Sequence, residues 1–265
     1  MTSAQLLLAS WDWPASEVVG CAGLLVAYGA LVRPLRWPRG LLFGVGVLVL
    51  LVTLAGPLDV IGERYLFSVH MLEHLVLIEV VPPLLIAGLP PEAVQRLLGK
   101  KLPGRVEAAL SRPWAAWLVG ILTLYAWHLP TLYNAALADE RLHALQHLSF
   151  LVAATVFWWP VLALRPAHTM KPHVTMVYLA VAATANSVLG AVLTFGTPAL
   201  YPTYTRPTDD SPALALIRDR WGVDPTSDLQ LGGMSMWVLG GLFFLVAILL
   251  AYANWYRHSG ELGIP

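Results

Sequence analysis

Long apolar segments, separated by short polar stretches, recur along the whole chain. An α-helix rises about 1.5 Å per residue, so about 20 apolar residues are needed to cross a hydrocarbon core of about 30 Å. The pattern predicts an all-α fold, a bundle of seven transmembrane helices that forms one domain over residues 1–265. The seven segments lie near residues 16–33, 38–58, 66–88, 113–130, 141–164, 173–197 and 231–255.

Basic residues fall mainly in alternate connections of this predicted bundle. Short cytoplasmic loops retain Lys and Arg, so their distribution indicates the orientation of the helices. Of the 16 basic residues, eleven follow the first, third, fifth and seventh segments, and five lie on the other side. We therefore expect the N-terminus outside and the C-terminus inside. The eleven are Arg33, Arg36, Arg39, Arg96, Lys100, Lys101, Arg105, Arg112, Arg165, Lys171 and Arg257.

Composition supports a multi-pass membrane protein. Hydrophobic residues make up 57% of the chain and charged residues 12%, with a mean hydropathy of +0.66, a balance outside the range of soluble domains. Cys21 is the single cysteine, which excludes an intramolecular disulfide and a CxxC motif. The N-terminus has no basic stretch before its short apolar run, which argues against a cleaved signal peptide. In the long outer connection, we expect "ALALIRDRWGV" to form a short interfacial helix with Trp221 at headgroup level.

Five of the eight histidines fall in one predicted layer near the outer surface. His70 and His74 lie four residues apart at the start of the third segment, as do His143 and His147 at the start of the fifth, and His128 ends the fourth. Residues four apart share one helical face, so each pair can chelate one ion. We predict that the two pairs converge on one metal site with His128 at its rim.

Acidic residues lie at the same depth as the histidines. Glu73 is on the same side of its helix as His70, and Asp228 begins the last segment from the outside. Carboxylates beside ligating imidazoles either bind the ion or accept the free ring N–H. Glu79 faces away from His70 and is expected to stay outside the site, where it either relays protons or pairs within the bundle. The predicted metal-site residues are His70, His74, His128, His143, His147, Glu73 and Asp228.

Other interpretations of the histidines remain open at this point. Imidazoles on two facing helices can hold haem in a membrane redox enzyme, and pairs four residues apart can also be hydrogen-bonded packing features. A zinc hydrolase is less well supported, because Glu73 does not occupy the HExxH position. A metal transporter needs a polar path to the cytoplasm, which only Glu79 suggests. The other three histidines, His168, His173 and His258, are expected to be solvated loop residues. Met71, Met234 and Met236 are individually more typical of packing.

Several longer motifs resemble one family. These are "FSVHMLEHLVLIEVVPPLLIAGLP", "WHLPTLYNAALADERLHALQHLSFLVAATVFWWPVL", "LYPTY" and "DLQLGGMSMWV". Together they are similar to CtaG-type cytochrome c oxidase assembly factors, which are seven-helix bacterial membrane proteins. The likeness covers most of the chain from the third segment onward. It implies a multi-pass protein of the bacterial cytoplasmic membrane whose five histidines and Asp228 match the family's motifs.

The resemblance also implies a function without catalysis. We expect a copper-binding metallochaperone, with zinc as the alternative metal, that helps mature haem-copper oxidase. Its expected partners are an oxidase subunit and a periplasmic copper donor, with no nucleic acid. Glu73 and Leu229 depart from the family pattern, which has Gln at both positions, and the added carboxylate can change the metal preference. Imidazole with nearby thioether sulfur favours copper.

Overall fold

The computed structural model describes residues 1–32, 37–93, 112–162, 170–206 and 211–261, without the side chains of residues 258–261. Within these ranges the secondary structure is entirely helical, with no strand. Several basic residues of the predicted inner loops and His168 lie outside the described residues, as does the side chain of His258. The basic residues concerned are Arg33, Arg36, Arg96, Lys100, Lys101, Arg105 and Arg165.

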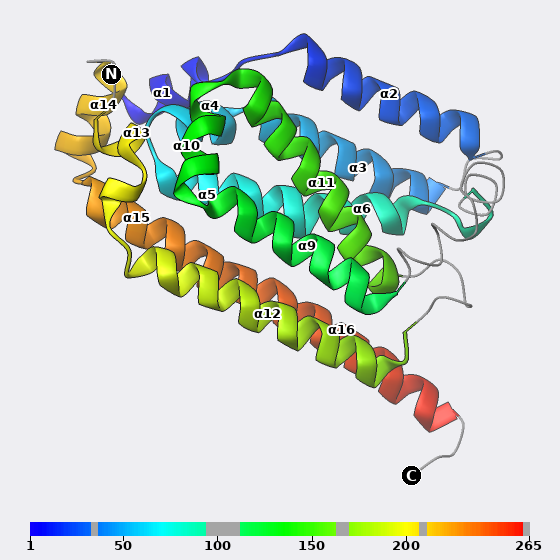
Figure 1. The fold of residues 1–265 in the computed structure, drawn as a ribbon. Coiled ribbons are helices and arrows are strands. Elements are labelled where there is room, and N and C mark those ends of the chain that lie inside the picture. Colours follow the sequence, from blue (N-terminus) through cyan, green and yellow to red (C-terminus); the bar gives the residue numbers. More distant parts are fainter. Residues whose placement is uncertain (33–36, 94–111, 163–169, 207–210, 262–265) are drawn as a thin grey trace.

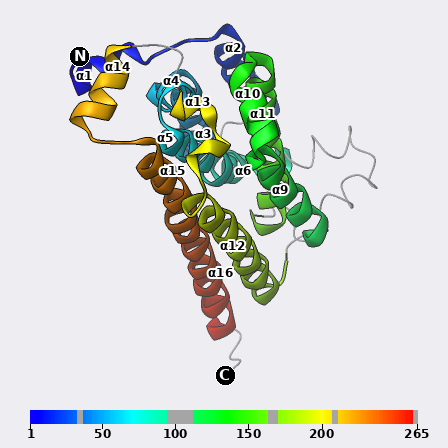
Figure 2. The same cartoon turned by 60° about the vertical axis from the view of Figure 1, so that its left-hand side comes forward.

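Long helices lie side by side and form the body of the molecule (Figure 1). α3 packs along α6, α9 along α11, and α12 along α15 and α16. The segment α5–η1–α6 lies in the middle and contacts α3, α4, α11 and α15 (Figure 2). The bounds of these helices are α2 Ala15–Leu31, α3 Trp37–Ala55, α4 Pro57–Arg64, α5 Phe67–Leu75, η1 Val76–Val80, α6 Val81–Gly88, α9 Pro113–His128, α11 Glu140–Leu162, α12 Pro172–Thr194, α15 Pro225–Met234, η5 Ser235–Gly240 and α16 Gly241–Glu261.

Shorter helices cover the end of the bundle where the predicted outer loops lie. α10 and α13 sit over this end, and α1 and α14 lie beside it (Figure 1). A short helix is present where the sequence predicted one, as α14 and η4, with Leu216 and Ile217 buried and Trp221 exposed. Its position at the membrane interface stays a prediction. The bounds are α1 Ser3–Ala9, α10 Pro130–Ala138, η3 Pro198–Leu200, α13 Pro202–Thr205, α14 Pro212–Ala215 and η4 Leu216–Arg220.

Five helical stretches are long and apolar enough to cross a membrane, judged by length and composition. A sixth is obtained when α9 and α10 count as one span, and α2 is a shorter apolar helix of 17 residues. The chain is therefore an all-helical membrane protein, and seven spans remain a prediction. α1 and the end of α16 lie at opposite ends of the bundle (Figure 1), and the orientation of these ends in a membrane stays a prediction.

A bend of 72° separates α9 from α10. Pro130 lacks a backbone N–H and disfavours helical geometry in the preceding residue, so Leu129 is extended (φ −64°, ψ 128°) and α9 ends at His128. The chain then turns across the end of the bundle. The turn brings Tyr133 of α10 into the core, where it is fully buried.

The third predicted segment is continuous but irregular in its middle. It changes from α to π geometry at η1 and returns to α at α6. Pro82 cannot donate to the carbonyl of Ile78, and the indole Nε1 of Trp158 donates to that oxygen instead, at 2.9 Å. Trp158 is therefore a specific hydrogen-bond donor and not only a packing residue.

Candidate metal centre

α5 places two histidines inside the bundle. His70 and His74 lie one helical turn apart and are both fully buried, with ring centroids 4.3 Å apart. α5 packs against α4, α15 and η5, so its histidine-bearing face is closed off from lipid. The spacing of four residues thus gives two neighbouring imidazoles in the protein interior.

α11 supplies the second pair. Asp139 accepts hydrogen bonds from the N–H groups of Arg141 and Leu142, at 2.8 and 3.1 Å, and so caps the start of the helix. This start places His143 and His147 in the first two turns, with ring centroids 4.2 Å apart. Both are more than nine-tenths buried.

The two pairs meet between α5 and α11. The ring centroid of His70 lies 5.3 Å from that of His143 and 6.3 Å from that of His147. Glu73 joins them, with its Oε1 3.7 Å from Nε2 of His147. One ligand atom from each of His70, Glu73, His143 and His147 lies within 4.8 Å of the other three. We call these four residues the ligand cluster.

The atoms of the ligand cluster that face one another lack hydrogen-bond partners. Nε2 of each of the three histidines and both carboxylate oxygens of Glu73 are buried and unpaired. An unsatisfied buried polar group costs about 1–3 kcal/mol, so such groups are rare unless something else binds them. Three imidazole nitrogens and one carboxylate oxygen form a four-donor set that suits zinc or copper. The residues therefore fit a bound metal ion.

Two more predicted residues border the ligand cluster. The ring centroid of His74 lies 6.0 Å from that of His147 and 5.5 Å from that of His128. Nδ1 of His128 must donate to the carbonyl of Leu124, at 2.7 Å, because a carbonyl only accepts. Its Nε2 is therefore a free acceptor, and both ring nitrogens of His74 are unpaired. His74 and His128 lie beside the four converging donors and are not among them.

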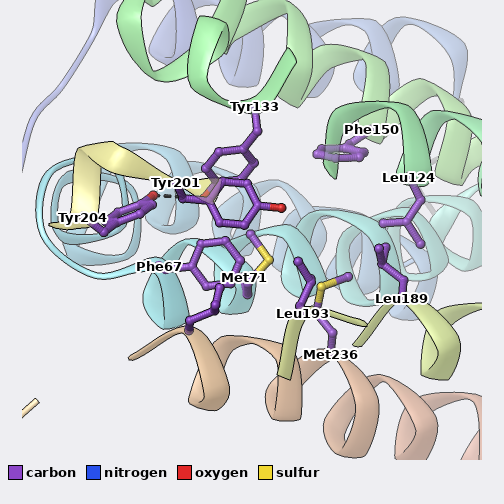
Figure 3. Close-up of a cluster of buried hydrophobic side chains, with 11 residues drawn as sticks. Phe67, Met71, Leu124, Tyr133, Phe150, Leu189, Leu193, Tyr201, Tyr204 and Met236 are labelled. Atoms are coloured by element: carbon purple, nitrogen blue, oxygen red, sulfur yellow. Dashed lines mark hydrogen bonds between the residues drawn. The ribbon is translucent and has the colours of Figure 1, made fainter. Parts of the chain in front are cut away.

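A tyrosine that the sequence did not single out fixes the orientation of His70. The hydroxyl of Tyr204 donates to the carbonyl of Gly62 at 2.9 Å, and it lies 2.9 Å from the hydroxyl of Tyr133 and 3.4 Å from Nδ1 of His70. Its single proton is used on Gly62, so Tyr133 and Nδ1–H of His70 donate to Tyr204. Nε2 of His70 then carries the lone pair that points into the ligand cluster. Figure 3 shows the hydrogen bond between the hydroxyls of Tyr133 and Tyr204 as a dashed line.

Tyr204 is itself held by the outer connection. It lies on the short helix α13, and Arg218 donates to its backbone carbonyl at 2.8 Å. Burial raises the pKa of the Tyr204 hydroxyl well above its usual range, so the hydroxyl keeps its proton. Tyr204 belongs to the motif "LYPTY" in the predicted outer connection. The tyrosine hydroxyls of this motif are the only feature of the sequence that could have indicated its contact with His70.

Asp228 has a different role from the one predicted. Its carboxylate accepts hydrogen bonds from the backbone N–H groups of Phe67 and Ser68, at 2.8 and 3.0 Å, and from the Ser68 hydroxyl at 2.6 Å. These are free donors at the start of α5, where Leu66 provides no side-chain cap. Asp228 therefore caps α5 from another helix, and the structure does not place it in the ligand cluster.

The three methionines named in the sequence analysis do not share one environment. Met71 and Met236 pack in a hydrophobic cluster with Phe67 and Tyr133 (Figure 3), whereas Met234 is about half exposed. Met71 and Met236 are therefore packing residues, as the sequence predicts for each of them singly.

Glu79 stays apart from the ligand cluster, as its helical position predicts. It is buried on η1 and, together with His74 and Asn186, lines a separate small cavity of about 30 Å³. Its Oε2 has no hydrogen-bond partner. The cavity has room for about one water molecule.

Comparison with known proteins identifies the family. Residues 24–258 match the model of the cytochrome c oxidase caa3 assembly factor family. The chain is also 25% identical to uncharacterized proteins of Mycobacterium bovis and Mycobacterium tuberculosis over 93% of its length, and 23% identical to one of Mycobacterium leprae over 95%. It spans about 40% of the length of these relatives. No solved structure matches. The family model covers most of the chain, which therefore belongs to the cytochrome c oxidase caa3 assembly factors.

Proposed function

We propose that this protein binds copper in the ligand cluster and delivers it during maturation of a haem-copper cytochrome c oxidase. The observation that carries the proposal is the convergence of four unpaired, buried donor atoms from α5 and α11. Membership of an oxidase assembly family supplies the recipient. Copper is the cargo in this account, and no catalytic step is assigned to the chain.

The donor set supports copper among the first-row metals. Imidazole ligands suit copper, zinc, iron and nickel, and copper heads the order of affinity of divalent ions for nitrogen and oxygen sites. Zinc accepts the same four donors and is the main competing metal. A delivery protein also has to release its ion, and His70 of the ligand cluster lies beside Gly62 of α4 and Tyr133 of α10. The starts of α5 and α11, which carry the cluster, lie far from the C-terminal end of α16 (Figure 1).

Haem fits the site less well. The histidine rings of α5 and α11 pack against one another, with centroids 4.2–6.3 Å apart, so a porphyrin has no space between them. The small cavity beside His74 measures about 30 Å³, whereas pockets for organic ligands measure about 300–1,000 Å³. This packing favours a single ion over a macrocycle.

Deletion of the gene in the organism that encodes the chain tests the proposed role. We expect lower oxidase activity and less oxidase copper, with oxidase polypeptide still present and partial recovery in excess copper. Complementation with the wild-type gene should restore both, and complementation with His147→Ala should not. Normal copper content of the oxidase in the deletion strain would contradict the proposal.

A further inference from the structure

A water-accessible cavity of about 330 Å³ lies next to the ligand cluster, between the start of α2, α4 and α11. His143 and His147 form part of its wall. A water molecule takes up about 30 Å³, so the cavity has room for a metal ion with a full shell of six waters. It connects the aqueous surface with two of the proposed ligands.

The wall of this cavity is strongly acidic. Arg64 and Arg141 also line it, which leaves three more acidic than basic residues. Glu63 lies within electrostatic range of Asp12 and Glu140, and Asp59 within range of Glu63 and Glu17. The acids therefore act on one shared volume and are not scattered over the surface. They are Asp12, Glu17, Asp59, Glu63 and Glu140.

At its inner side, the acidic wall of the cavity adjoins residues of the ligand cluster. Nε2 atoms of His143 and His147 are buried and have no hydrogen-bond partner. The Asp59 carboxyl lies within hydrogen-bonding range of the Glu73 carboxyl. Two adjacent carboxylates repel each other unless a proton or a cation lies between them. Carboxylates thus lead from the cavity mouth to the ligand cluster.

We infer that this cavity is an entry vestibule, in which a hydrated copper ion collects before it exchanges water for the imidazoles of His143 and His147. This inference rests on the proposed copper site and adds the route and the form in which the ion arrives. Charged pockets with an excess of one sign concentrate counter-ions and can raise association rates by about 10–1,000-fold, an effect that salt weakens. The three surplus acidic residues give this cavity such an excess.

Stopped-flow measurement of copper binding tests the vestibule. The probe is Cu²⁺ added to the full chain in nanodiscs without a histidine tag, followed by quenching of tryptophan fluorescence. We expect Glu63→Gln and Glu140→Gln together to slow association about 3–10-fold at low salt, and the difference to shrink at 0.5 M salt, because part of the steering field is removed. Asp219→Asn is the control, because Asp219 is exposed outside the vestibule.

The possible results distinguish a failure of the proposed entry route from a failure of the proposed copper site. Equal association rates for the wild type and the double variant, with no dependence on salt, would contradict the proposed entry route. This result would not affect the proposed copper site. Failure of the wild type to bind copper would overturn both. The double variant could also bind free Cu²⁺ at the wild-type rate but accept copper more slowly from a copper-loaded basic peptide. This result would show that the acidic wall docks a protein, and it would contradict the entry of a hydrated ion.

Discussion

At the scale of single residues, the site depends on where each imidazole holds its proton. Three carbonyl and hydroxyl contacts decide this: Tyr204 with Gly62, Tyr204 with His70, and His128 with Leu124. They leave Nε2 of His70 and His128 as free acceptors. A hydrogen bond to the second ring nitrogen also makes a ligating imidazole more basic. Residues outside the ligand cluster therefore tune its affinity for a metal.

Tyr204→Phe removes the hydroxyl that holds His70. We expect copper affinity to fall about 10–100-fold, because His70 loses the contact that fixes its tautomer and ring orientation. Competition titration with a chromophoric copper chelator measures this affinity. Tyr201→Phe is the matched control, since its hydroxyl donates to the backbone carbonyl of His128 and not to a ligating ring. Equal affinities for the two variants would contradict the role of Tyr204.

At the scale of helices, the position of α5 depends on contacts from other parts of the chain. Asp228 of α15 caps its first turn, and Gly62 of α4 lies against its backbone. A methyl group at Gly62 would come within 2.9 Å of the Cα of His70, so α4 and α5 approach closely only because residue 62 is glycine. These contacts set the depth and rotation of the helix that carries His70 and Glu73.

Asp228→Ala should loosen the start of α5. The variant leaves buried N–H groups of Phe67 and Ser68 unpaired, which costs about 1–3 kcal/mol of stability. We expect a lower thermal midpoint of unfolding in detergent, with substantial recovery in Asp228→Asn, because an amide oxygen can still accept. A ligand role would give the opposite pattern: copper affinity lost equally in both variants, with the thermal midpoint unchanged.

The local sequence pattern predicts the helices and the histidine pairs on them. It does not predict the contacts that orient the histidine rings. Spacing of four residues placed His70 beside His74 and His143 beside His147, because helix geometry is local. Position around the helix also separated Glu79 from the site. The cap formed by Asp228 joins residues about 160 positions apart, and Tyr204 lies 134 positions from His70. Such pairs depend on how the helices pack, which no local pattern encodes.

At the scale of the whole molecule, the ligand cluster and the vestibule share the start of α11. This start lies at the end of the bundle that α10 and α13 cover (Figure 1). The distribution of basic residues predicts that this end faces outward. The number of crossings bears on the same point, because seven spans would require both the short helix α2 and the bent pair α9–α10 to cross in addition to the five long apolar helices. Delivery to an oxidase from outside requires this orientation.

Reporter fusions determine the orientation. We expect a periplasm-active reporter placed after Asp210 to be active and the same reporter placed after Lys101 to be inactive, because the positive-inside rule assigns the basic loop to the cytoplasm. A cytoplasm-active reporter at the same two positions should give the reverse result and is the control. Activity of one reporter at both positions would contradict the predicted topology.

The copper content of protein purified without a histidine tag and loaded with copper shows whether the ligand cluster binds this metal. We expect about one tightly bound ion per chain in the wild type, because the four donors converge on one point. His147→Ala should lose most of this copper while keeping its helical circular dichroism, and His173→Ala, an exposed histidine on α12, should retain it. A wild type that binds no copper, or a His147→Ala variant that binds as much as the wild type, would contradict the central claim.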